Sequence, residues 1–213
     1  MGFVGWCRVG TCGDCKLLGG GGGGEFFKIY VSGVMKDGAQ RKAERMCGEK
    51  VVISDYPAPE LLANVAKNVE TNVPEAVRLR SRPTVQGHEW GEFATSFATT
   101  QKGYFSRILA ADCLWMPQQH RNLARSMVHF LSTAKEAQDG GRVFVVAGFH
   151  TGRAKVAGFF ETAEEEGLVV ERIEEMDVEG RRREWRQVRE GEDLGERKRW
   201  VVVAVLRGGR VGR

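Results

Sequence analysis

From residue 51 to its end, the chain alternates short runs of β-branched and aromatic residues with longer amphipathic stretches. Apolar runs predict strands at residues 51–53, 83–90, 105–111, 142–149, 168–173 and 200–206. Helical spacing of apolar residues predicts helices at 60–70, 117–137 and 152–166. Strands that alternate with helices of this length imply crossover connections and a parallel sheet with helices on both faces. The predicted fold class is therefore α/β.

The end of the chain departs from this alternation. Residues 177–199 are rich in charge and have no apolar face that could cover a sheet. The strand expected at 200–206 therefore pairs antiparallel with the strand before it. The prediction is a mostly parallel sheet that ends in a C-terminal antiparallel hairpin, with the acidic and arginine-rich runs at 161–199 as solvated surface.

The first 48 residues differ from the rest. Residues 19–24 are an unbroken glycine run, which is typical of a flexible linker. Cys7, Cys12 and Cys15 precede it, but no fourth ligand follows at the spacing of a zinc site, so we expect no metal. We divide the chain into a glycine-rich, poorly ordered segment at 1–48, a folded domain at 49–207 and a tail at 208–213.

Composition excludes several classes of protein. Of 213 residues, 42% are hydrophobic and 28% charged, which is ordinary for a globular domain and excludes a disordered or disulfide-stapled chain. A net charge of +4 is too small to predict nucleic-acid binding. No apolar stretch reaches the roughly 18–20 residues of a membrane helix, and the N-terminus has no signal-peptide pattern. We expect a cytoplasmic monomer without membrane or nucleic-acid partners.

Polar residues follow several of the predicted strands, at the edge where ligands bind in α/β sheets. Asp55 suits the two hydroxyls of a ribose; the alternative is a helix cap or a turn before Pro57. Trp90 suits stacking on a purine, or else it is a core tryptophan at the sheet edge. His150 and Arg153 suit substrate orientation and anion binding, or else they are loop and helix-start residues.

Residues 111–115 (Ala-Asp-Cys-Leu-Trp) form the most informative of these strings. They follow an apolar strand, which places Asp112 at the ligand edge. Methyl transfer to an amine needs a neutral, well-positioned nitrogen, which a carboxylate can orient while an aromatic wall such as Trp115 excludes water. The alternative is that Asp112 caps the next helix and Trp115 belongs to the core.

Taken in order, these residues resemble one fungal family, the nicotinamide N-methyltransferase-like proteins within the wider lysine methyltransferase family 21 group. The resemblance covers about residues 49–207. It rests on the strings 51–57 (Val-Val-Ile-Ser-Asp-Tyr-Pro), 88–91 (His-Glu-Trp-Gly), 111–115 and 148–153 (Gly-Phe-His-Thr-Gly-Arg), and on Asn64, Asn68, Gln119 and His120.

The resemblance implies a Rossmann-like class I methyltransferase fold with S-adenosylmethionine as cofactor. It places Asp55 on the ribose, Trp90 near the adenine and Ala111 at the cofactor's edge. Asp112 and Trp115 match the family's Asp-x-x-aromatic unit and become the candidate catalytic residues, with Trp115 where Tyr or Phe is commoner. Some family members methylate the N-terminus and lysines of translation elongation factor 1-alpha, so the implied partner is a protein substrate of that kind.

One feature of the family is not found. The family has a strand followed by Glu-Leu-Gly-x-Gly-x-Gly-Leu-Pro about twenty residues before the ribose acid. Residues 31–38 instead read Val-Ser-Gly-Val-Met-Lys-Asp-Gly, which lacks the glycine triad. We therefore expect a sheet that is incomplete at its N-terminal strand.

The leading functional hypothesis is an S-adenosylmethionine-dependent methyltransferase that acts on a protein amine. The alternatives are a catalytically inactive, truncated methyltransferase-like protein and a small-molecule, nicotinamide-type N-methyltransferase. A nucleotide-dependent oxidoreductase on a related fold is disfavoured, because no G-x-G-x-x-G motif follows the first strand.

Overall fold

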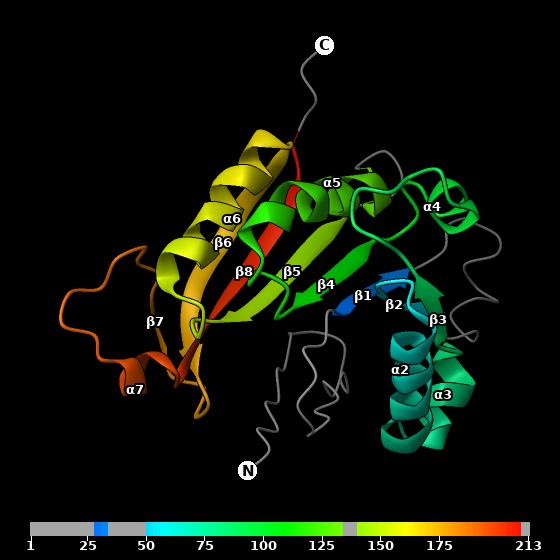
Figure 1. The fold of residues 1–213 in the computed structure, drawn as a ribbon, viewed down its shortest axis with the longest axis horizontal. Coiled ribbons are helices and arrows are strands. Elements are labelled where there is room, and N and C mark those ends of the chain that lie inside the picture. The colour runs from blue at the N-terminus through cyan, green and yellow to red at the C-terminus, as the bar shows by residue number, and fades with distance from the viewer. Residues whose placement is uncertain (1–27, 34–49, 134–139, 210–213) are drawn as a thin grey trace.

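The described part of the chain is built on one sheet of eight strands (Figure 1). The computed structural model describes residues 28–33, 50–133 and 140–209. The strands are β1 (Lys28–Gly33), β2 (Lys50–Asp55), β3 (Thr84–Gly87), β4 (Arg107–Ala111), β5 (Arg142–Gly148), β6 (Leu168–Asp177), β7 (Arg182–Glu184) and β8 (Trp200–Gly208). Their order is β3-β2-β1-β4-β5-β8-β6-β7, and the predicted α/β class is confirmed.

Most of the strands run in one direction. β2 pairs parallel with β3, and β4 pairs parallel with β5. β8 lies between β5 and β6 and is antiparallel to both, while β7 is antiparallel to β6. The C-terminal antiparallel pairing predicted from the charged segment at 177–199 is therefore confirmed, although that segment also contains β7 and a short helix.

β1 occupies the middle of the sheet, where the sequence predicted an incomplete strand. It is antiparallel to both of its neighbours, β2 and β4, so the sheet is continuous at this position. Gly33 pairs with Lys50 and Lys28 pairs with Ala111, so the carboxyl end of β1 lies at the edge opposite to the carboxyl ends of β2 and β4. The expected gap is thus corrected to a strand of reversed direction.

One helix is shorter than the sequence predicted. The helix predicted at 117–137 is a 3-10 turn followed by a helix that ends at Phe130, because Leu131 is extended and pairs with Phe105. Two predicted helices, α2 and α6, lie where apolar spacing placed them. The helices of the described residues are α2 (Pro59–Asn72), α3 (Glu75–Ser81), α4 (Ser96–Thr100), η1 (Pro117–Gln119), α5 (His120–Phe130), α6 (Arg153–Glu165) and α7 (Leu194–Arg197).

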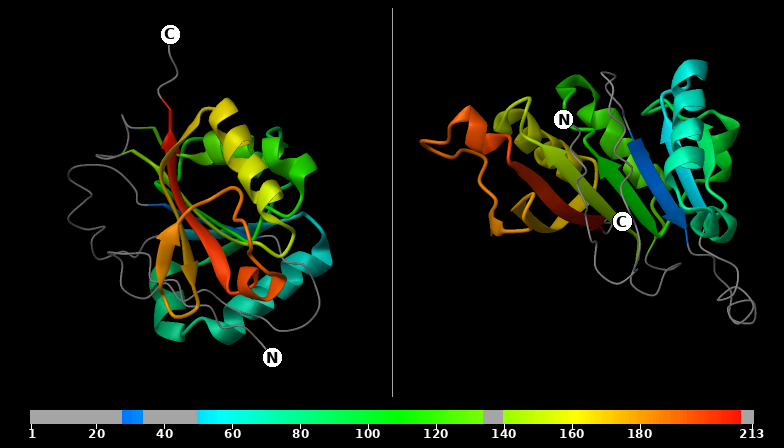
Figure 2. Two further views of the ribbon diagram at one scale, coloured as in Figure 1. Left: turned by 90° about the vertical axis from the view of Figure 1, so that its left-hand side faces the viewer. Right: turned by 90° about the horizontal axis from the view of Figure 1, so that it is seen from below.

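Apolar side chains pack on both faces of the sheet, as the alternation along β2 shows. Val52 belongs to the large cluster that includes residues of α5, α6, β4, β5 and β8, whereas Ile53 packs with Val65 and Val69 of α2. α5 and α6 lie side by side on one face (Figure 2). The larger core therefore fixes the carboxyl ends of β4 and β5, where the sequence predicted the ligand site.

The N-terminal segment predicted at 1–48 is described only through β1. The glycine run and the three N-terminal cysteines lie outside the described residues. The domain boundaries stay predictions, with β8 continuing to Gly208. Among the described residues, every helix is too short or too polar to span a bilayer.

Candidate functional site

Three strands end along one edge of the sheet (Figure 1). Asp55 is the last residue of β2, Asp112 follows β4, and His150 comes two residues after β5. Trp90 comes three residues after the end of β3, which pairs parallel with β2. The structure therefore places the four polar or aromatic strand-end residues predicted from the sequence at the same edge.

The reversed strand β1 sets the spacing along this edge. Ile29 pairs with Ser54 on one side and with Ala110 on the other. Asp55 and Ala111 are therefore two strand spacings apart, or roughly 10 Å. This distance separates Asp55, the residue predicted to bind a ribose, from the candidate catalytic string that begins at Ala111.

Asp55 is a buried carboxylate, with only 4% of its surface exposed. Its Oδ1 accepts a hydrogen bond from the N–H of Tyr56 at 2.8 Å. The residue that precedes α2 is Ala58, and it makes no side-chain cap. The helix-cap alternative for Asp55 is therefore wrong, and its contact with Tyr56 lies within the turn before Pro57.

The loop that carries Trp90 is attached to α5 by one hydroxyl group. Ser126 Oγ accepts a hydrogen bond from the Gly91 N–H at 2.9 Å and lies 3.1 Å from Nε2 of His88. The His88 N–H donates to the Asp55 carbonyl at 2.8 Å, which ties the loop to the end of β2. Trp90 is half-buried and packs against the larger core, so the core alternative holds for part of its ring.

Sequence reasoning missed Ser126. It is fully buried on the same helical face as Leu123, Met127 and Phe130. A hydroxyl within an apolar helical stripe needs a hydrogen-bond partner from another element, and that was the available signal. The partner, His88, is 38 positions away in the sequence, so only the folded structure identifies it.

Burial lowers the pKa of His88 from 6.5 to about 4, with His129 lowering it further and Glu92 opposing the shift. Between pH 6.5 and about 4, His88 is therefore protonated in the unfolded chain but stays neutral in the folded chain. Its contribution to stability is complete above pH 6.5 and is lost as the pH falls toward 4.

We expect the free energy of unfolding to fall on the order of 3 kcal/mol across this window, at about 1.4 kcal/mol per pKa unit. Urea unfolding at pH values of about 7, 6, 5 and 4 measures it. His88→Gln should reduce the pH dependence of the free energy of unfolding. Part of that dependence should remain, because burial also lowers the pKa of His120. An unchanged slope in the variant would contradict the assignment.

Asp112 is held in a strained backbone conformation. Its φ is +54°, in the left-handed region that favours glycine and, after it, Asn and Asp. Its N–H donates to the Val146 carbonyl at 2.7 Å, and its Oδ1 accepts from the Gly148 N–H at 3.4 Å. The residue before η1 is Met116, so the helix-cap alternative for Asp112 is wrong. The side chain is exposed at the sheet edge.

Buried contacts on both sides fix the turn that carries Trp115. The thiol of Cys113 donates to the Ala111 carbonyl at 3.3 Å, and Nε2 of His120 lies 2.9 Å from the Leu114 carbonyl. Cys113 and Leu114 are buried, whereas Trp115 is half-buried. Two contacts therefore hold the turn next to Asp112, which suits an aromatic wall.

The side chains of His150 and Asp112 both lie close to Gly148. A Cβ atom built on Gly148 would lie 3.1 Å from Nδ1 of His150 and 3.9 Å from Oδ1 of Asp112. An imidazole and a carboxylate thus flank the same backbone position, on the part of the edge farther from Asp55. The exposed position of His150 leaves it accessible to a substrate.

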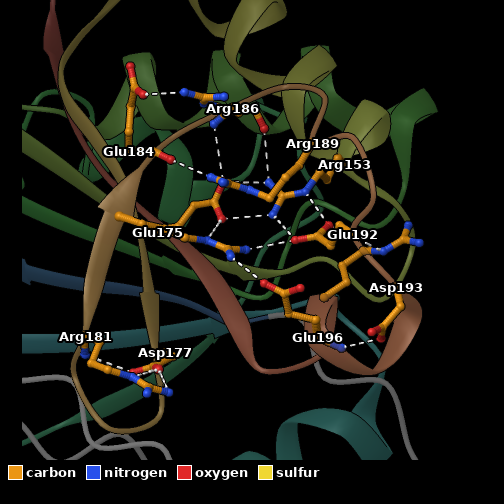
Figure 3. Close-up of polar contacts among 12 residues, drawn as sticks. Arg153, Glu175, Asp177, Arg181, Glu184, Arg186, Arg189, Glu192, Asp193 and Glu196 are labelled. Atoms are coloured by element: carbon orange, nitrogen blue, oxygen red, sulfur yellow. Dashed lines mark hydrogen bonds and ion pairs between the residues drawn. The ribbon is translucent and has the colours of Figure 1, made fainter.

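Arg153 does not face an open ligand site, as one interpretation of the sequence proposed. It is the first residue of α6 and only 7% exposed. Its guanidinium bonds to both carboxylate oxygens of Glu175 at 2.7 and 2.9 Å and to both of Glu192 at 2.7 Å (Figure 3). The helix-start alternative is therefore correct, and the residue belongs to a buried ion cluster.

The same cluster includes Arg183 and Arg189 from the arginine-rich segment, which the sequence predicted to be solvated surface. Arg183 donates to Glu175, Glu192 and Glu196, and Arg189 donates to Glu175. Burial acts to lower the pKa of Arg153, but the carboxylates of Glu192 and Glu175 outweigh it and raise the pKa. Burial acts to raise the pKa of Glu175, but Arg153 and Arg183 outweigh it and lower that pKa. Arg153 lowers the pKa of Glu192 against the opposing effect of burial, so both carboxyl groups are ionised near neutral pH.

Two shallow hollows lie elsewhere on the described part of the molecule. One, of about 390 Å³, lies beside the last turn of α5, and the other, of about 420 Å³, lies beside α2 and α3. Neither is lined by Asp55, Trp90 or Asp112. The strand edge shared by the described residues, and neither of these two hollows, therefore defines the candidate site.

No family model matches the chain. Its sequence is similar to that of several proteins named protein N-terminal and lysine N-methyltransferase EFM7. The likeness is to methyltransferases. Identity is 31% over 130 residues with the Candida glabrata protein, covering 59% of this chain and 48% of the relative. For the Yarrowia lipolytica protein it is 30% over 146 residues, covering 60% and 50%.

The chain therefore spans about half the length of the relatives that it matches. Their names support a methyltransferase family, which agrees with the broader part of the sequence resemblance. The nicotinamide-type and family 21 assignments stay predictions.

Two solved structures are also similar. A predicted O-methyltransferase from Agrobacterium tumefaciens has 12% identity and a TM-score of 0.47, covering 83% of this chain and 73% of that one. The Methanococcus jannaschii fibrillarin pre-rRNA processing protein has 13% identity and a TM-score of 0.45, covering 74% and 55%.

Proposed function

We propose that the chain is an S-adenosylmethionine-dependent methyltransferase that transfers a methyl group to an amine of a protein, either a lysine or the N-terminus. The supporting observation is that Asp55, the Trp90 loop and Asp112 share one sheet edge in a chain similar to protein N-methyltransferases. By the family resemblance, the proposed substrate is translation elongation factor 1-alpha, and the proposed setting is a cytoplasmic monomer.

The described residues fit the adenosine half of this cofactor. A buried carboxylate at Asp55 suits the ribose hydroxyls. The Trp90 loop, fixed to α5 by Ser126, suits the adenine, and Ala111 lies at the end of β4 next to the candidate catalytic string. We assign these three residues to cofactor binding.

Asp112 and Trp115 are the proposed catalytic residues. When bound, the cofactor supplies an electrophilic methyl group on a sulfonium. The acceptor nitrogen must be neutral and correctly oriented, and the Asp112 carboxylate accepts a hydrogen bond from its N–H. Trp115 supplies an aromatic wall that excludes water and favours positive charge on the product amine. The turn at 112–116, which two contacts hold, carries both of these groups.

A second candidate is a methyltransferase-like protein without catalytic activity, and the direction of β1 favours it. In the family, a glycine-rich loop follows the middle strand at the ligand edge. In this chain, Gly33 at the carboxyl end of β1 pairs with Lys50 at the opposite edge. Among the described residues, no loop therefore follows the middle strand beside Asp55, and the methionine half of the cofactor lacks this support.

Calorimetric titration with S-adenosylhomocysteine separates the two candidates. We expect saturable binding with a dissociation constant in the micromolar range. Asp55→Ala should weaken it by about tenfold or more, because a hydrogen bond to a charged group contributes about 1.5–3 kcal/mol. Glu60→Gln, which removes an exposed carboxylate in the first turn of α2, is the matched control and should leave binding unchanged.

Absence of saturable binding would remove the methyltransferase proposal and leave the inactive candidate. If binding is observed, incubation with methyl-labelled cofactor tests the acceptor. We expect label in the protein fraction of a cell extract. Label that enters only nicotinamide would replace the protein substrate with the small-molecule alternative.

A further inference from the structure

A strap at residues 185–199 joins β7 to β8 and contains α7. It returns to the sheet at Trp200, and the next residue, Val201, pairs with Gly148 at the end of β5. In the strand order, β5 and β8 lie on the side of β4 away from β2. The strap therefore approaches the site from the side opposite to Asp55, which is the side left for the methyl acceptor.

Two contacts fix the strap against the turn between β5 and α6. The ring of Trp185 stacks on that of Phe149, with centroids 5.8 Å apart and planes at 22°. Glu192, only 3% exposed, receives two hydrogen bonds from Arg153. Both Phe149 and Arg153 belong to the segment that carries His150.

Arg153 uses its whole guanidinium for this connection (Figure 3). Besides the four bonds to Glu175 and Glu192, its Nη1 donates to the carbonyl of Arg186 in the strap at 3.1 Å. All five of its N–H donors are therefore engaged, three with groups of the strap and two with Glu175 of β6. A lysine has no planar fork and could not bridge the two carboxylates in this way.

A continuous series of contacts leads from this cluster to the candidate catalytic carboxylate. The Arg153 guanidinium carbon lies 4.1 Å from the centre of the Phe149 ring. The Phe149 carbonyl accepts from the Gly152 N–H at 3.0 Å, which closes the turn. Gly148, directly before Phe149, donates to Asp112. The position of this turn, and of His150 within it, thus depends on Arg153.

We infer that Arg153 is a positioning residue for the acceptor side of the site, which it acts on by clamping the strap to the β5–α6 turn. The clamped strap forms a fixed wall beside His150 and Asp112, against which the protein substrate is placed. This inference rests on the proposed function, because it assigns the acceptor side of that same site.

The test uses Glu192→Gln in the full chain, which removes the strap carboxylate that Arg153 holds and leaves Glu175 in place. Glu196→Gln is the matched control: Glu196 lies in the same strap and bonds to Arg183 but not to Arg153. Hydrogen exchange is measured by mass spectrometry in the peptides that contain residues 147–152 and 185–199. The Michaelis constant for the protein acceptor and the dissociation constant of S-adenosylhomocysteine are measured on the same samples.

We expect Glu192→Gln to speed exchange in both peptides by about tenfold or more, and to raise the acceptor's Michaelis constant while cofactor-product affinity stays unchanged. Glu196→Gln should match the unaltered protein. Unchanged exchange in Glu192→Gln, or faster exchange with an unchanged Michaelis constant, overturns the inference. Loss of cofactor-product binding in the unaltered protein instead overturns the proposed function, and the positioning role with it, while exchange still decides whether the strap is clamped.

Discussion

Replacing Arg153 with methionine is expected to lower the free energy of unfolding by about 3–5 kcal/mol. The substitution leaves two buried carboxylates, those of Glu175 and Glu192, without their central cation. Removing one partner of a buried ion pair is costly because little solvent reaches the remaining charge. Arg183 still contacts both carboxylates, but the four hydrogen bonds from Arg153 are lost. Urea unfolding at neutral pH measures the loss.

Arg121→Met is the control for this substitution. Arg121 also contacts two carboxylates, Glu165 and Glu166, but its side chain is 60% exposed. An exposed pair contributes about 0–1 kcal/mol, so the control should be nearly neutral. Adding Glu175→Gln to the Arg153→Met variant should recover part of the lost free energy of unfolding, because it removes one of the two carboxylates that Arg153 contacted. Equal effects of Arg153→Met and Arg121→Met would show that the cluster is not buried as described.

Substituting Asp112 should separate activity from stability. We expect Asp112→Asn to reduce methyl transfer by roughly 100-fold or more, since it removes the carboxylate that orients the acceptor. Asn tolerates the left-handed conformation, so the free energy of unfolding should stay within about 0.5 kcal/mol. Asp112→Gly should lose as much activity while becoming up to about 1 kcal/mol more stable, because glycine adopts a φ of +54° without strain.

The measurements are initial rates with a protein acceptor and urea unfolding of the same samples. Glu60→Gln is a control for the loss of a carboxylate, because Glu60 is exposed in the first turn of α2 and lies outside both the strap and the 111–115 string. Activity retained by both Asp112 variants would remove Asp112 from the catalytic role. Loss of activity together with loss of stability would point instead to a structural role.

Sequence patterns predicted the long elements of the fold but not its centre. β5 and β8 are dense in β-branched residues, and α2 and α6 repeat apolar residues at helical spacing, so local physics was sufficient. The direction of β1 was not predictable, because a strand pattern reads the same in both directions and only the pairing with β2 and β4 decides it. α3, α4, α7 and β7 are too short to give a periodic signal.

The candidate site and the adjoining ion cluster likewise include residues that the sequence predicted and residues that it did not. Asp55 and Asp112 were predictable because one ends a buried strand and the other directly follows one. Glu175 was not, since its partner Arg153 is 22 positions away and a bulge between Val170 and Arg172 shifts the alternation of β6. Once the bulge is known, Glu175 lies on the inward face, where a carboxylate requires a cation.

The reversed strand at the centre has a consequence for the whole molecule. β2 with β3 and β4 with β5 are two parallel units, and in the described sheet β1 lies between them and pairs with both. Its six residues pair with the inner margins of both units, which would otherwise expose unpaired amides and carbonyls. Margins of that kind recruit strands from other molecules. The pairing of this short segment with both units therefore protects the centre of the sheet against the addition of a strand from another molecule.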